Sequence, residues 1–450
     1  MSLARFENLI SWARHHGAYI HEQVEVYDDP QYGVSLRVRS SQQSVHLASH
    51  SDQLPRQSLP PTACVVSCPF SLSLSYLNAL NKFPDLQSHS ARFPALLLEV
   101  LEPHVIGHFF LVQQYLDADT SHWGPYVRSL PQPEESGKLG TPLYFTEADI
   151  AWIRGTDLEI ARDQREKTWK SDWERGHRIL DASSGWEKWN GKWTWDLYKW
   201  AATIFSSRSF ISTLIPEEVF RMPVTYGTKS FDDIFPVLFP LLDLPNHSTA
   251  AKVTWFTNVQ NEPKDLSILV ESEIPYGQQI FNNYAPKSNT ELMLGYGFCI
   301  PGNDEVSIAF KPLREELMII RQRHLACLGS HSGDSKQSIF HVRSTPYTRP
   351  PDDTRLPGFR LVEDGCVDAL AVLTANRRER EYMIQHPSRC PERSLEAVFM
   401  GPLSRNILKV MAVLSDKLEE GLHDIISTGQ HLGYVECLQT QIILAFRHYS

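Results

Sequence analysis

The segments 242–248 (LDLPNHS) and 277–284 (GQQIFNNY) decide how this chain folds. Alone, each has an ordinary interpretation. An Asn-His pair after a strand is most often a turn with satisfied side chains, and a tyrosine after two asparagines is most often an aromatic residue at a strand end. Here the two segments occur in this order, with 206–210 (SSRSF) upstream and 294–298 (LGYGF) downstream. That combination is far more specific than any one of the segments.

The periodicity of apolar residues predicts a mixed α+β chain. Residues 6–20 have the spacing of an amphipathic helix that ends at Gly17, and a helical pattern resumes at Phe93. The stretch 156–195 mixes charges with tryptophans and predicts an inserted helical piece. The stretch 40–62, rich in Ser, Gln, His and Pro, predicts a long irregular connection. Short β-like runs predict strands at 24–26, 34–38, 253–256, 267–270 and 279–281.

The last third of the chain changes character and predicts a separate helical domain at 303–450. Apolar residues repeat there at helical spacing, and the segment 329–358, rich in Ser, Pro and Gly, predicts a loop within the domain. The repeating residues are Leu313, Leu317 and Ile320, then Leu403, Ile407, Val410, Met411, Leu414, Leu418, Leu422 and Ile425, and finally Leu432, Val435, Leu438, Ile442 and Phe446.

Length and composition exclude several classes of protein. With 450 residues the chain is long enough for two or three structural units, and 42% hydrophobic residues permit a packed core. The net charge of −10 argues against a broad face that binds nucleic acid. We find no apolar run of about 18 residues that would span a membrane, and the N-terminus lacks the pattern of a signal peptide.

The seven cysteines are dispersed and odd in number, which fits free thiols in a reducing compartment. Cys64 and Cys68 are four residues apart, but no second pair or histidine cluster completes a zinc set. We therefore expect no metal site. We also expect a cytoplasmic or nuclear protein that binds neither nucleic acid nor membranes.

Tryptophan is unevenly distributed along the chain. Eight of the 11 tryptophans fall between Trp152 and Trp200. We expect them to form the core of the inserted helical piece, because a short segment needs large side chains to bury enough apolar area. The alternative is that some of them contact a substrate directly.

The order and spacing of Asn246-His247, Tyr284 and Tyr296 resemble SET-domain methyltransferases of the Rubisco large-subunit methyltransferase-like class. The resemblance implies an α+β chain with a SET β-fold, in which one segment is threaded through a loop to form a pseudoknot. It also implies a SET domain at 1–300 with a helical insert at about 111–200. The helical domain at 303–450 would then bind the protein substrate.

The same resemblance implies S-adenosyl-L-methionine as the cofactor. The planar fork of Arg208 would pair with the carboxylate of the cofactor's amino-acid end. The other cofactor-binding residues would be Tyr32, Gly33, Val34, Asp243, Asn246, His247 and Tyr284. Ser35 stands where the usual glycine-rich turn of the family has a second glycine, so the backbone near the cofactor departs from the family pattern.

The resemblance further implies a protein-lysine N-methyltransferase that acts on a non-histone protein. Tyr284 would orient a neutral lysine amine, Tyr296 would share the catalytic channel, and Phe210, Tyr296 and Phe298 would line the substrate side. After Cys299 the next cysteine is Cys327, so the cysteine-rich zinc site that follows many histone-directed SET domains is missing. We expect a monomer, and the acidic net charge favours a basic partner such as a ribosomal or translation-related protein.

Two alternatives to this function are open. Ser35 and Pro245 would fit a catalytically inactive SET-fold protein that only binds a partner. The acceptor could instead be a histidine or a small metabolite. A histidine-methylating relative carries a polar amide at the position of Phe210, so the phenylalanine favours lysine.

Overall fold

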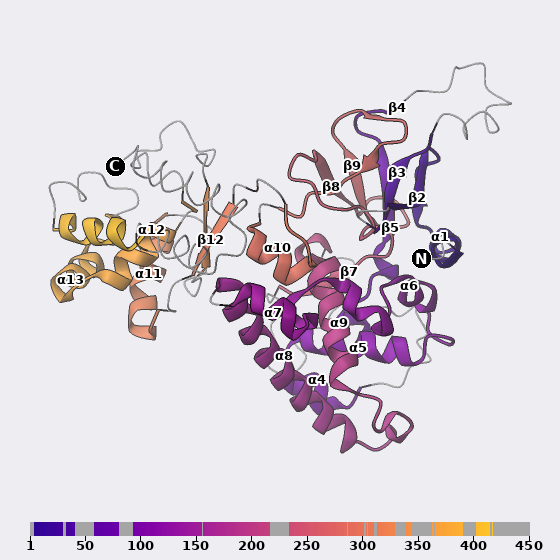
Figure 1. Ribbon diagram of the computed structural model, residues 1–450, viewed down its shortest axis with the longest axis horizontal. Helices are drawn as coiled ribbons and strands as arrows, with labels where there is room; N and C mark the ends of the chain where they lie inside the picture. The colour runs from indigo at the N-terminus through magenta and orange to yellow at the C-terminus, as the bar shows by residue number, and fades with distance from the viewer. Residues whose placement is uncertain are drawn as a thin grey trace. The chain divides into compact units, whose positions relative to one another are not determined.

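The computed structural model places most of the first 300 residues and parts of the remainder (Figure 1). The described residues are 4–29, 33–40, 58–80, 93–154, 156–216, 234–285, 287–300, 303, 305–309, 313–328, 339–343, 362–363, 365–389, 402–414 and 416. The chain divides into two compact units, the first formed by Met1–Leu139 and Gln164–Ala285 and the second by Gly140–Asp163 and Pro286–Ser450. Among the described residues, no helix is both long and apolar enough to cross a membrane.

Antiparallel strands form two main sheets in the first unit. One has the order β1-β5-β9-β8 and the other β11-β3-β2. The period-2 alternation is plain in β9, where Leu266, Ile268 and Val270 are buried in the core. The strands are β1 (Tyr19–Ile20), β2 (Val24–Asp29), β3 (Gly33–Val38), β4 (Ser58–Leu59), β5 (Cys64–Pro69), β6 (Ser209–Ile211), β7 (Pro236–Leu238), β8 (Val253–Asn258), β9 (Asp265–Val270), β10 (Ile274–Pro275) and β11 (Gln279–Ile280). The strands predicted from the sequence are therefore confirmed.

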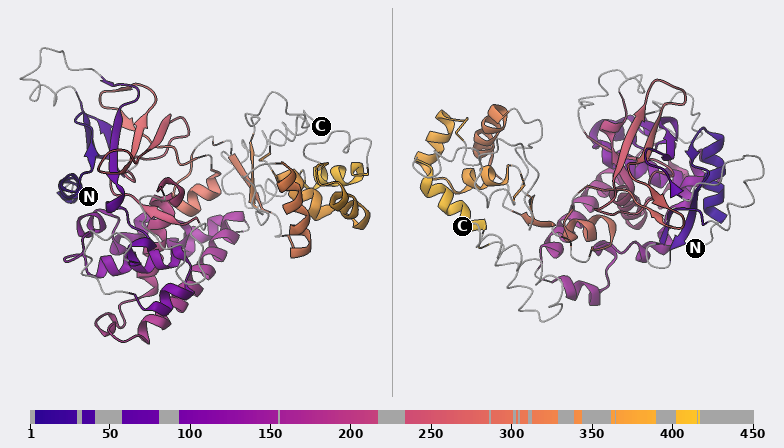
Figure 2. Two further views of the ribbon diagram at one scale, coloured as in Figure 1. Left: turned by 180° about the vertical axis from the view of Figure 1, so that it is seen from behind. Right: turned by 90° about the horizontal axis from the view of Figure 1, so that it is seen from above.

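Helices of the first unit gather on one side of its strands (Figures 1 and 2). They are α1 (Ala4–His15), α3 (Tyr76–Ala79), α4 (Ala95–Val100), α5 (Pro103–Leu116), α6 (Gly124–Ser129) and α9 (Trp195–Arg208), with α8 (Asp157–Asp181) contributing to both units. Short 3₁₀ helices are η1 (Phe70–Leu72), η2 (Pro133–Leu139), η3 (Pro142–Tyr144), η4 (Glu187–Trp189) and η5 (Ser212–Leu214). Gly17 follows α1 with φ of 91°, a left-handed conformation that suits glycine at a helix end.

Tryptophans of the insert form a continuous core with the rest of the first unit. Trp186, Trp189, Trp193 and Trp200 are all buried in one cluster with the strands' apolar residues. The ring of Trp186 stacks on Phe93 at 5.0 Å between centroids. This arrangement supports core packing over direct substrate contact and shows that the insert has no separate core of its own. Trp152 is the exception, with 52% of its surface exposed.

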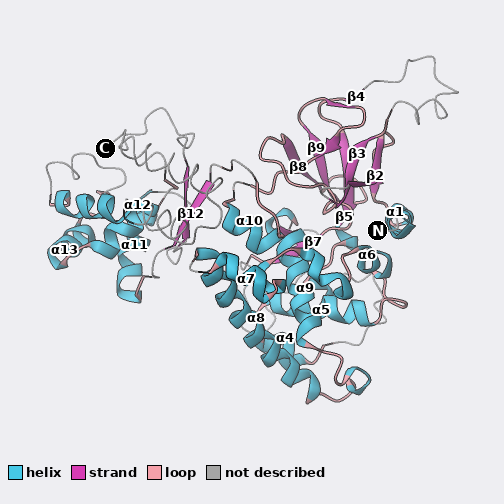
Figure 3. Cartoon of the chain, in the orientation of Figure 1, coloured by secondary structure: helices cyan, strands magenta, loops and turns pink. Residues whose placement is uncertain are grey.

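The second unit contains helices and, in contrast to the prediction, a two-stranded antiparallel sheet (Figure 3). Its elements are α7 (Glu147–Ile153), α10 (Asn289–Tyr296), β12 (Glu305–Ala309), α11 (Glu315–Leu328), β13 (Ile339–Arg343), α12 (Cys366–Thr374), α13 (Arg377–Gln385) and a helix at 404–414. β12 pairs with β13 in antiparallel register, so part of the predicted loop at 329–358 is a strand. The apolar repeat from Leu403 to Leu414 is buried as expected, whereas the predicted helix at 432–446 lies outside the described residues.

The division into units differs from the predicted domain limits of 1–300 and 303–450. Residues 140–163, which the prediction assigned to the insert, belong to the second unit, and so does α10. Asn289 in α10 explains the second difference: its amide donates to Ile300 O at 3.1 Å and accepts from Asn303 at 3.2 Å. These bonds tie α10 to the chain that leads into β12. The predicted irregular connection at 40–62 also contains β4 at its end, and 41–57 lie outside the described residues.

Replacing Trp189 by Ala is expected to lower the free energy of unfolding by about 3–5 kcal/mol, because a large buried aromatic leaves a cavity. Urea unfolding followed by circular dichroism measures the change. Trp152→Ala is the control, since its half-exposed ring predicts an effect within about 0.5 kcal/mol. Equal effects of the two substitutions would contradict the assignment of the tryptophans to the core.

Candidate active site

The two decisive segments meet through backbone pairing. His247 and Asn282 form a parallel β-bridge. Asn282 N donates to Asn246 O at 2.8 Å, and Ser248 N donates to Asn282 O at 2.9 Å. This pairing joins residues more than thirty positions apart and brings Asn246-His247 beside Tyr284, as the expected pseudoknot requires. The threading is therefore held by main-chain hydrogen bonds, which do not depend on the side chains present.

Asn282 also fixes this junction through its buried side chain. Its Oδ1 accepts hydrogen bonds from Trp255 Nε1 at 2.9 Å and from Asn283 N at 2.8 Å. Trp255, in β8, packs edge-on against Phe210 with 5.1 Å between ring centroids. Phe210 is buried in β6 and also contacts Phe239. Phe210, which is predicted to line the substrate side, is thus linked through Trp255 to Asn282 at the junction.

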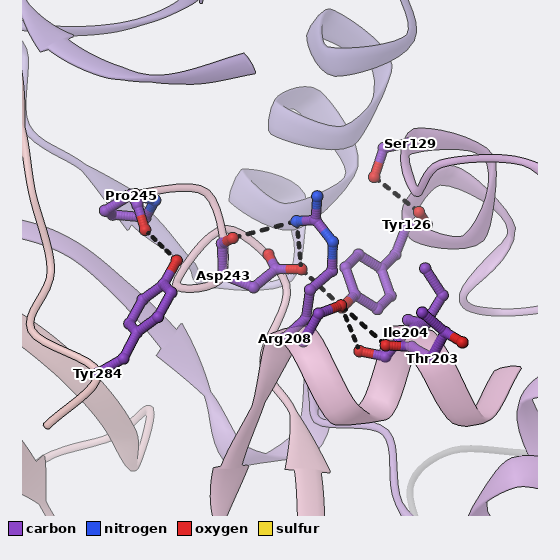
Figure 4. Close-up of polar contacts among 9 residues, drawn as sticks. Tyr126, Ser129, Thr203, Ile204, Arg208, Asp243, Pro245 and Tyr284 are labelled. Carbon is purple, nitrogen blue, oxygen red and sulfur yellow. Dashed lines mark hydrogen bonds and ion pairs between the residues drawn. The ribbon is translucent and has the colours of Figure 1, made fainter. Parts of the chain in front are cut away.

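His247 and Tyr284 form a stacked pair. Their ring centroids lie 5.0 Å apart with an interplanar angle of 21°, and His247 Nδ1 accepts the backbone N–H of Tyr284 at 3.0 Å. The hydroxyl of Tyr284 donates to Pro245 O at 2.9 Å (Figure 4). Because the hydroxyl proton is donated to Pro245 O, the phenolic oxygen can accept a hydrogen bond from another donor.

Arg208 is the last residue of α9 and pairs with the buried carboxylate of Asp243 (Figure 4). Arg208 Nη1 donates to Asp243 O at 3.1 Å and lies 3.3 Å from Asp243 Oδ2. Tyr126, from α6, donates its hydroxyl to the same Oδ2 at 3.0 Å. Burial raises the pKa of Asp243, and the charge of Arg208 opposes that rise.

Of the Arg208 guanidinium, only Nη1 takes part in the pairing with Asp243. Its Nε and Nη2 make no hydrogen bond with any residue that the structure describes, and the side chain is 27% exposed. Two adjacent N–H groups of this kind can bind a carboxylate in a bidentate manner. The donor set therefore fits the carboxylate of an α-amino-acid group, as expected for the amino-acid end of S-adenosylmethionine.

Ser35 occupies the place of the expected glycine without breaking the strand. It is fully buried in β3, and its Oγ accepts the backbone N–H of Asn246 at 3.3 Å. Gly33 begins β3 with φ of 74°, followed by Val34 in the same strand. The departure from the family pattern thus adds a contact between the turn strand and Asn246. This observation weakens one argument for an inactive protein.

Three of the site residues predicted from the sequence lie outside the described part of the first unit. Tyr32 lies outside the described residues. Tyr296 and Phe298 belong to the second unit, where they flank the left-handed Gly297 at the end of α10 and face one another with ring centroids 6.1 Å apart. Their roles remain predictions.

Tyr126, Trp255 and Asn282 are site components that the sequence did not reveal. Tyr126 is 117 positions from its partner Asp243, and no local pattern marks it. Asn282 lies within 277–284, so the sequence pattern includes its position, but nothing in the sequence indicates its contacts with Trp255 and Asn283. Across the described parts of the chain, no group of three or more His, Cys, Asp or Glu residues could hold a metal ion. Cys64 and Cys68 are free thiols.

Comparison with known sequences gives named relatives, although no protein-family model matches the chain. "Ribosomal lysine N-methyltransferase set10" of Schizosaccharomyces pombe is 29% identical over 305 residues, or 68% of this chain and 48% of the relative. "Protein-lysine N-methyltransferase EFM1" of Saccharomyces cerevisiae is 23% identical over 65% of this chain and 49% of the relative. An "Actin-histidine N-methyltransferase" of Drosophila melanogaster is 26% identical over 43% of this chain and 35% of the relative. The chain spans about half or less of the length of these curated relatives.

Solved structures resemble the chain over nearly its whole length. "Crystal structure of the SET domain of LSMT bound to Lysine and AdoHcy" has a TM-score of 0.59 at 14% identity and covers 100% of this chain and 91% of that one. "Structure of Rubisco LSMT bound to AdoMet" has a TM-score of 0.54 at 16% identity and covers 99% and 90%.

The fold and the paired segments define an α+β protein with a SET fold. More particularly, its fold is that of the Rubisco large-subunit methyltransferase, so the resemblance found in the sequence is confirmed by relatives named as lysine methyltransferases and by these structures.

Asn282→Ala is expected to lower the free energy of unfolding by about 1–3 kcal/mol, because it removes a buried amide that accepts from the partly buried indole N–H of Trp255 and from Asn283 N. Asn283→Ala is the matched control. Its Nδ2 donates to Thr249 O and Ala251 O at 3.5 and 3.3 Å and its Oδ1 accepts from Ala285 N at 3.0 Å, all at exposed or partly buried positions where water can replace the lost partner. Urea unfolding compares the two. A smaller loss for Asn282→Ala than for Asn283→Ala would refute the role given to Asn282.

Proposed function

We propose that this protein is an S-adenosylmethionine-dependent protein-lysine N-methyltransferase that acts on a non-histone protein. The observation that carries the proposal is a backbone pairing that joins Asn246-His247 to Tyr284 within a SET fold, with the Arg208 guanidinium held beside it by Asp243. Two of the relatives are named as protein-lysine or ribosomal lysine methyltransferases, which supports the acceptor class.

Cofactor binding is the first task of these residues. When bound, S-adenosylmethionine supplies a methyl group activated by a sulfonium charge. Arg208 would bind the carboxylate through Nε and Nη2 while Asp243 retains Nη1. Asn246 and His247 would contribute further hydrogen bonds, with Asp243, Gly33, Val34, Tyr32 and Tyr284 completing the set predicted from the sequence.

Tyr284 is proposed to orient the acceptor amine. A lysine amine has an unperturbed pKa of about 10.4, so transfer near neutral pH requires surroundings that favour the uncharged form. The hydroxyl of Tyr284 donates to Pro245 O, so its oxygen can accept an N–H from the neutral amine. Holding the nitrogen in one direction raises the rate by alignment. Tyr296, Phe298 and Phe210 are proposed to exclude water around the amine.

The substrate is proposed to be a ribosomal or translation-related protein. The name of the Schizosaccharomyces pombe relative supports this class, and the net charge of −10 favours encounter with a basic partner. The helical part of the second unit, within 303–450, is proposed to bind that substrate. We also propose a cytoplasmic or nuclear location and a monomeric state, with no nucleic-acid or membrane partner.

Histidine is the second candidate acceptor, because the actin-histidine methyltransferase of Drosophila melanogaster is 26% identical to part of the chain. Phe210 favours lysine over histidine. Its ring is enclosed by Phe239 and Trp255 and offers no polar group to orient an imidazole.

Tyr284→Phe is expected to abolish methyl transfer to a ribosomal protein fraction while S-adenosylmethionine still binds, because it removes the acceptor for the amine and the bond to Pro245 O but keeps the ring that stacks on His247. Mass spectrometry of the fraction, with cofactor binding measured by calorimetry, tests both points. Tyr276→Phe is the control, since its hydroxyl accepts one long hydrogen bond, from Gln23 Nε2 at 3.4 Å, within the described part of the first unit.

Three outcomes of this experiment are informative. Full activity of Tyr284→Phe would show that the catalytic assignment is wrong. Absence of cofactor binding to the unsubstituted protein at millimolar concentration would favour the inactive, partner-binding alternative. Methylation found on histidine instead of lysine would replace the acceptor class but keep the cofactor site.

A further inference from the structure

Tyr126 reaches the proposed cofactor site from the helical insert. It is buried in α6, and its hydroxyl donates to Asp243 Oδ2 at 3.0 Å (Figure 4). The same oxygen lies 3.3 Å from Arg208 Nη1. Two donors from two different helices therefore meet on one carboxylate oxygen, and only one of them, Arg208, is expected to contact a ligand.

The backbone around Tyr126 is fixed on both sides. Before it, Trp123 Nε1 donates to Leu72 O at 3.0 Å. Gly124 packs so closely on Ala118 that an added Cβ would lie 2.2 Å from its carbonyl oxygen. After it, Ser129 Oγ donates to Tyr126 O at 2.7 Å. A tyrosine held in this way presents its hydroxyl at one place, which is what a rigid support for a neighbouring charge requires.

Three titratable or charged groups face Asp243 from three elements. Arg208 comes from α9, Tyr126 from α6 and the buried Cys68 from β5. Burial raises the pKa of Asp243, whereas the Arg208 charge and the Tyr126 hydrogen bond both lower it. Burial and the nearby Asp243 raise the pKa of Cys68 well above its ordinary value, so its thiol adds no charge near neutral pH.

We propose that Tyr126 is a positioning residue for the cofactor site: its hydroxyl holds Asp243 as an oriented carboxylate, and Asp243 in turn holds the Arg208 guanidinium. The inference rests on the proposed function, because Arg208 is the group assigned to the cofactor carboxylate. It assigns to α6 of the helical insert an indirect part in cofactor binding, through Asp243 and Arg208, in addition to its packing role.

The pairing of Arg208 with Asp243 requires the carboxylate to be ionised. As the pH falls through the pKa of Asp243, the carboxylate becomes neutral and Arg208 loses its ion pair, keeping only the hydrogen bond to Asp243 O. Removing the Tyr126 hydroxyl takes away one of the two groups that lower this pKa, so the pKa rises. In Tyr126→Phe the loss of cofactor affinity on acidification therefore begins at a higher pH than in the unsubstituted protein.

The test is calorimetric titration of S-adenosylmethionine over a range of pH for the full chain and for Tyr126→Phe. We expect the Kd of the variant to rise about tenfold, the change typical of losing a hydrogen bond to a charged group. The acid limb of the affinity profile should also move to higher pH. At saturating cofactor, kcat should be unchanged, since Tyr126 contacts neither reactant.

Tyr198→Phe is the matched control. Tyr198 is also fully buried, and its hydroxyl lies 3.1 Å from His108 Nδ1, away from Asp243. Both substitutions should lower the melting temperature, but only Tyr126→Phe should change the pH profile. If Tyr198→Phe moved the acid limb as much, or Tyr126→Phe left it in place, the positioning role would be refuted.

Asp243→Asn provides a further check that does not depend on overall affinity. Without an ionisable group at 243, adding Tyr126→Phe should no longer move the acid limb, and a persisting shift would overturn the inference.

If Tyr126→Phe did not fold, 3-fluorotyrosine at 126 would keep the packing. This stronger donor should move the acid limb to lower pH, and no movement would count against the role. Failure of the proposed function is distinguishable, because the unsubstituted protein would then not bind S-adenosylmethionine at any pH.

Discussion

The parallel pairing of Asn246–Ser248 with Asn282 is the interaction on which the site depends. It consists of two main-chain hydrogen bonds of 2.8 and 2.9 Å, and it brings the Asn-His pair beside Tyr284. The stack of His247 on Tyr284 and the bond from Tyr284 to Pro245 join the same two segments. Trp255 then closes the junction from β8 by bonding Asn282. The catalytic geometry is thus a consequence of chain topology more than of any single side chain.

A second constraint links the helical insert to this junction. Asp243 lies three residues before Asn246 and is buried, and a buried carboxylate is costly unless it is paired and hydrogen-bonded. α9 supplies Arg208 and α6 supplies Tyr126. Because the tryptophans of the insert share one core with the strands, the positions of α6 and α9 relative to the strands are set by packing. The insert therefore supports the charges at the site as well as the stability of the first unit.

Much of the fold followed from the sequence, and the reasons are local. The strands at 34–38 and 267–270 were predictable from their apolar, β-rich composition, and the tryptophan-rich insert was predictable because so many large apolar rings must be buried. β13 was missed because it is a five-residue strand inside a stretch rich in Ser, Pro and Gly. The grouping of α10 with the second unit could not be predicted, because the bonds of Asn289 to Ile300 and Asn303 have no signature in the sequence.

For the site, the sequence supplied residue types through a family resemblance, and the structure supplied their partners. Arg208 was expected from the resemblance, but its pairing with Asp243 and the support from Tyr126 join residues 35 and 117 positions apart. No periodicity reports contacts at such separations. Ser35 shows the opposite case: a departure from the family pattern that raised doubt in the sequence is, in the structure, a buried hydrogen-bond acceptor for Asn246.

The most direct test of this account is a crystal structure of the protein grown with S-adenosylhomocysteine. The account predicts that the carboxylate of the bound molecule accepts hydrogen bonds from Arg208 Nε and Nη2, with Arg208 Nη1 still on Asp243 and the Asn246–Asn282 pairing intact. A bound molecule that does not touch Arg208, or whose binding separates the Asn246–Asn282 pairing, would contradict it.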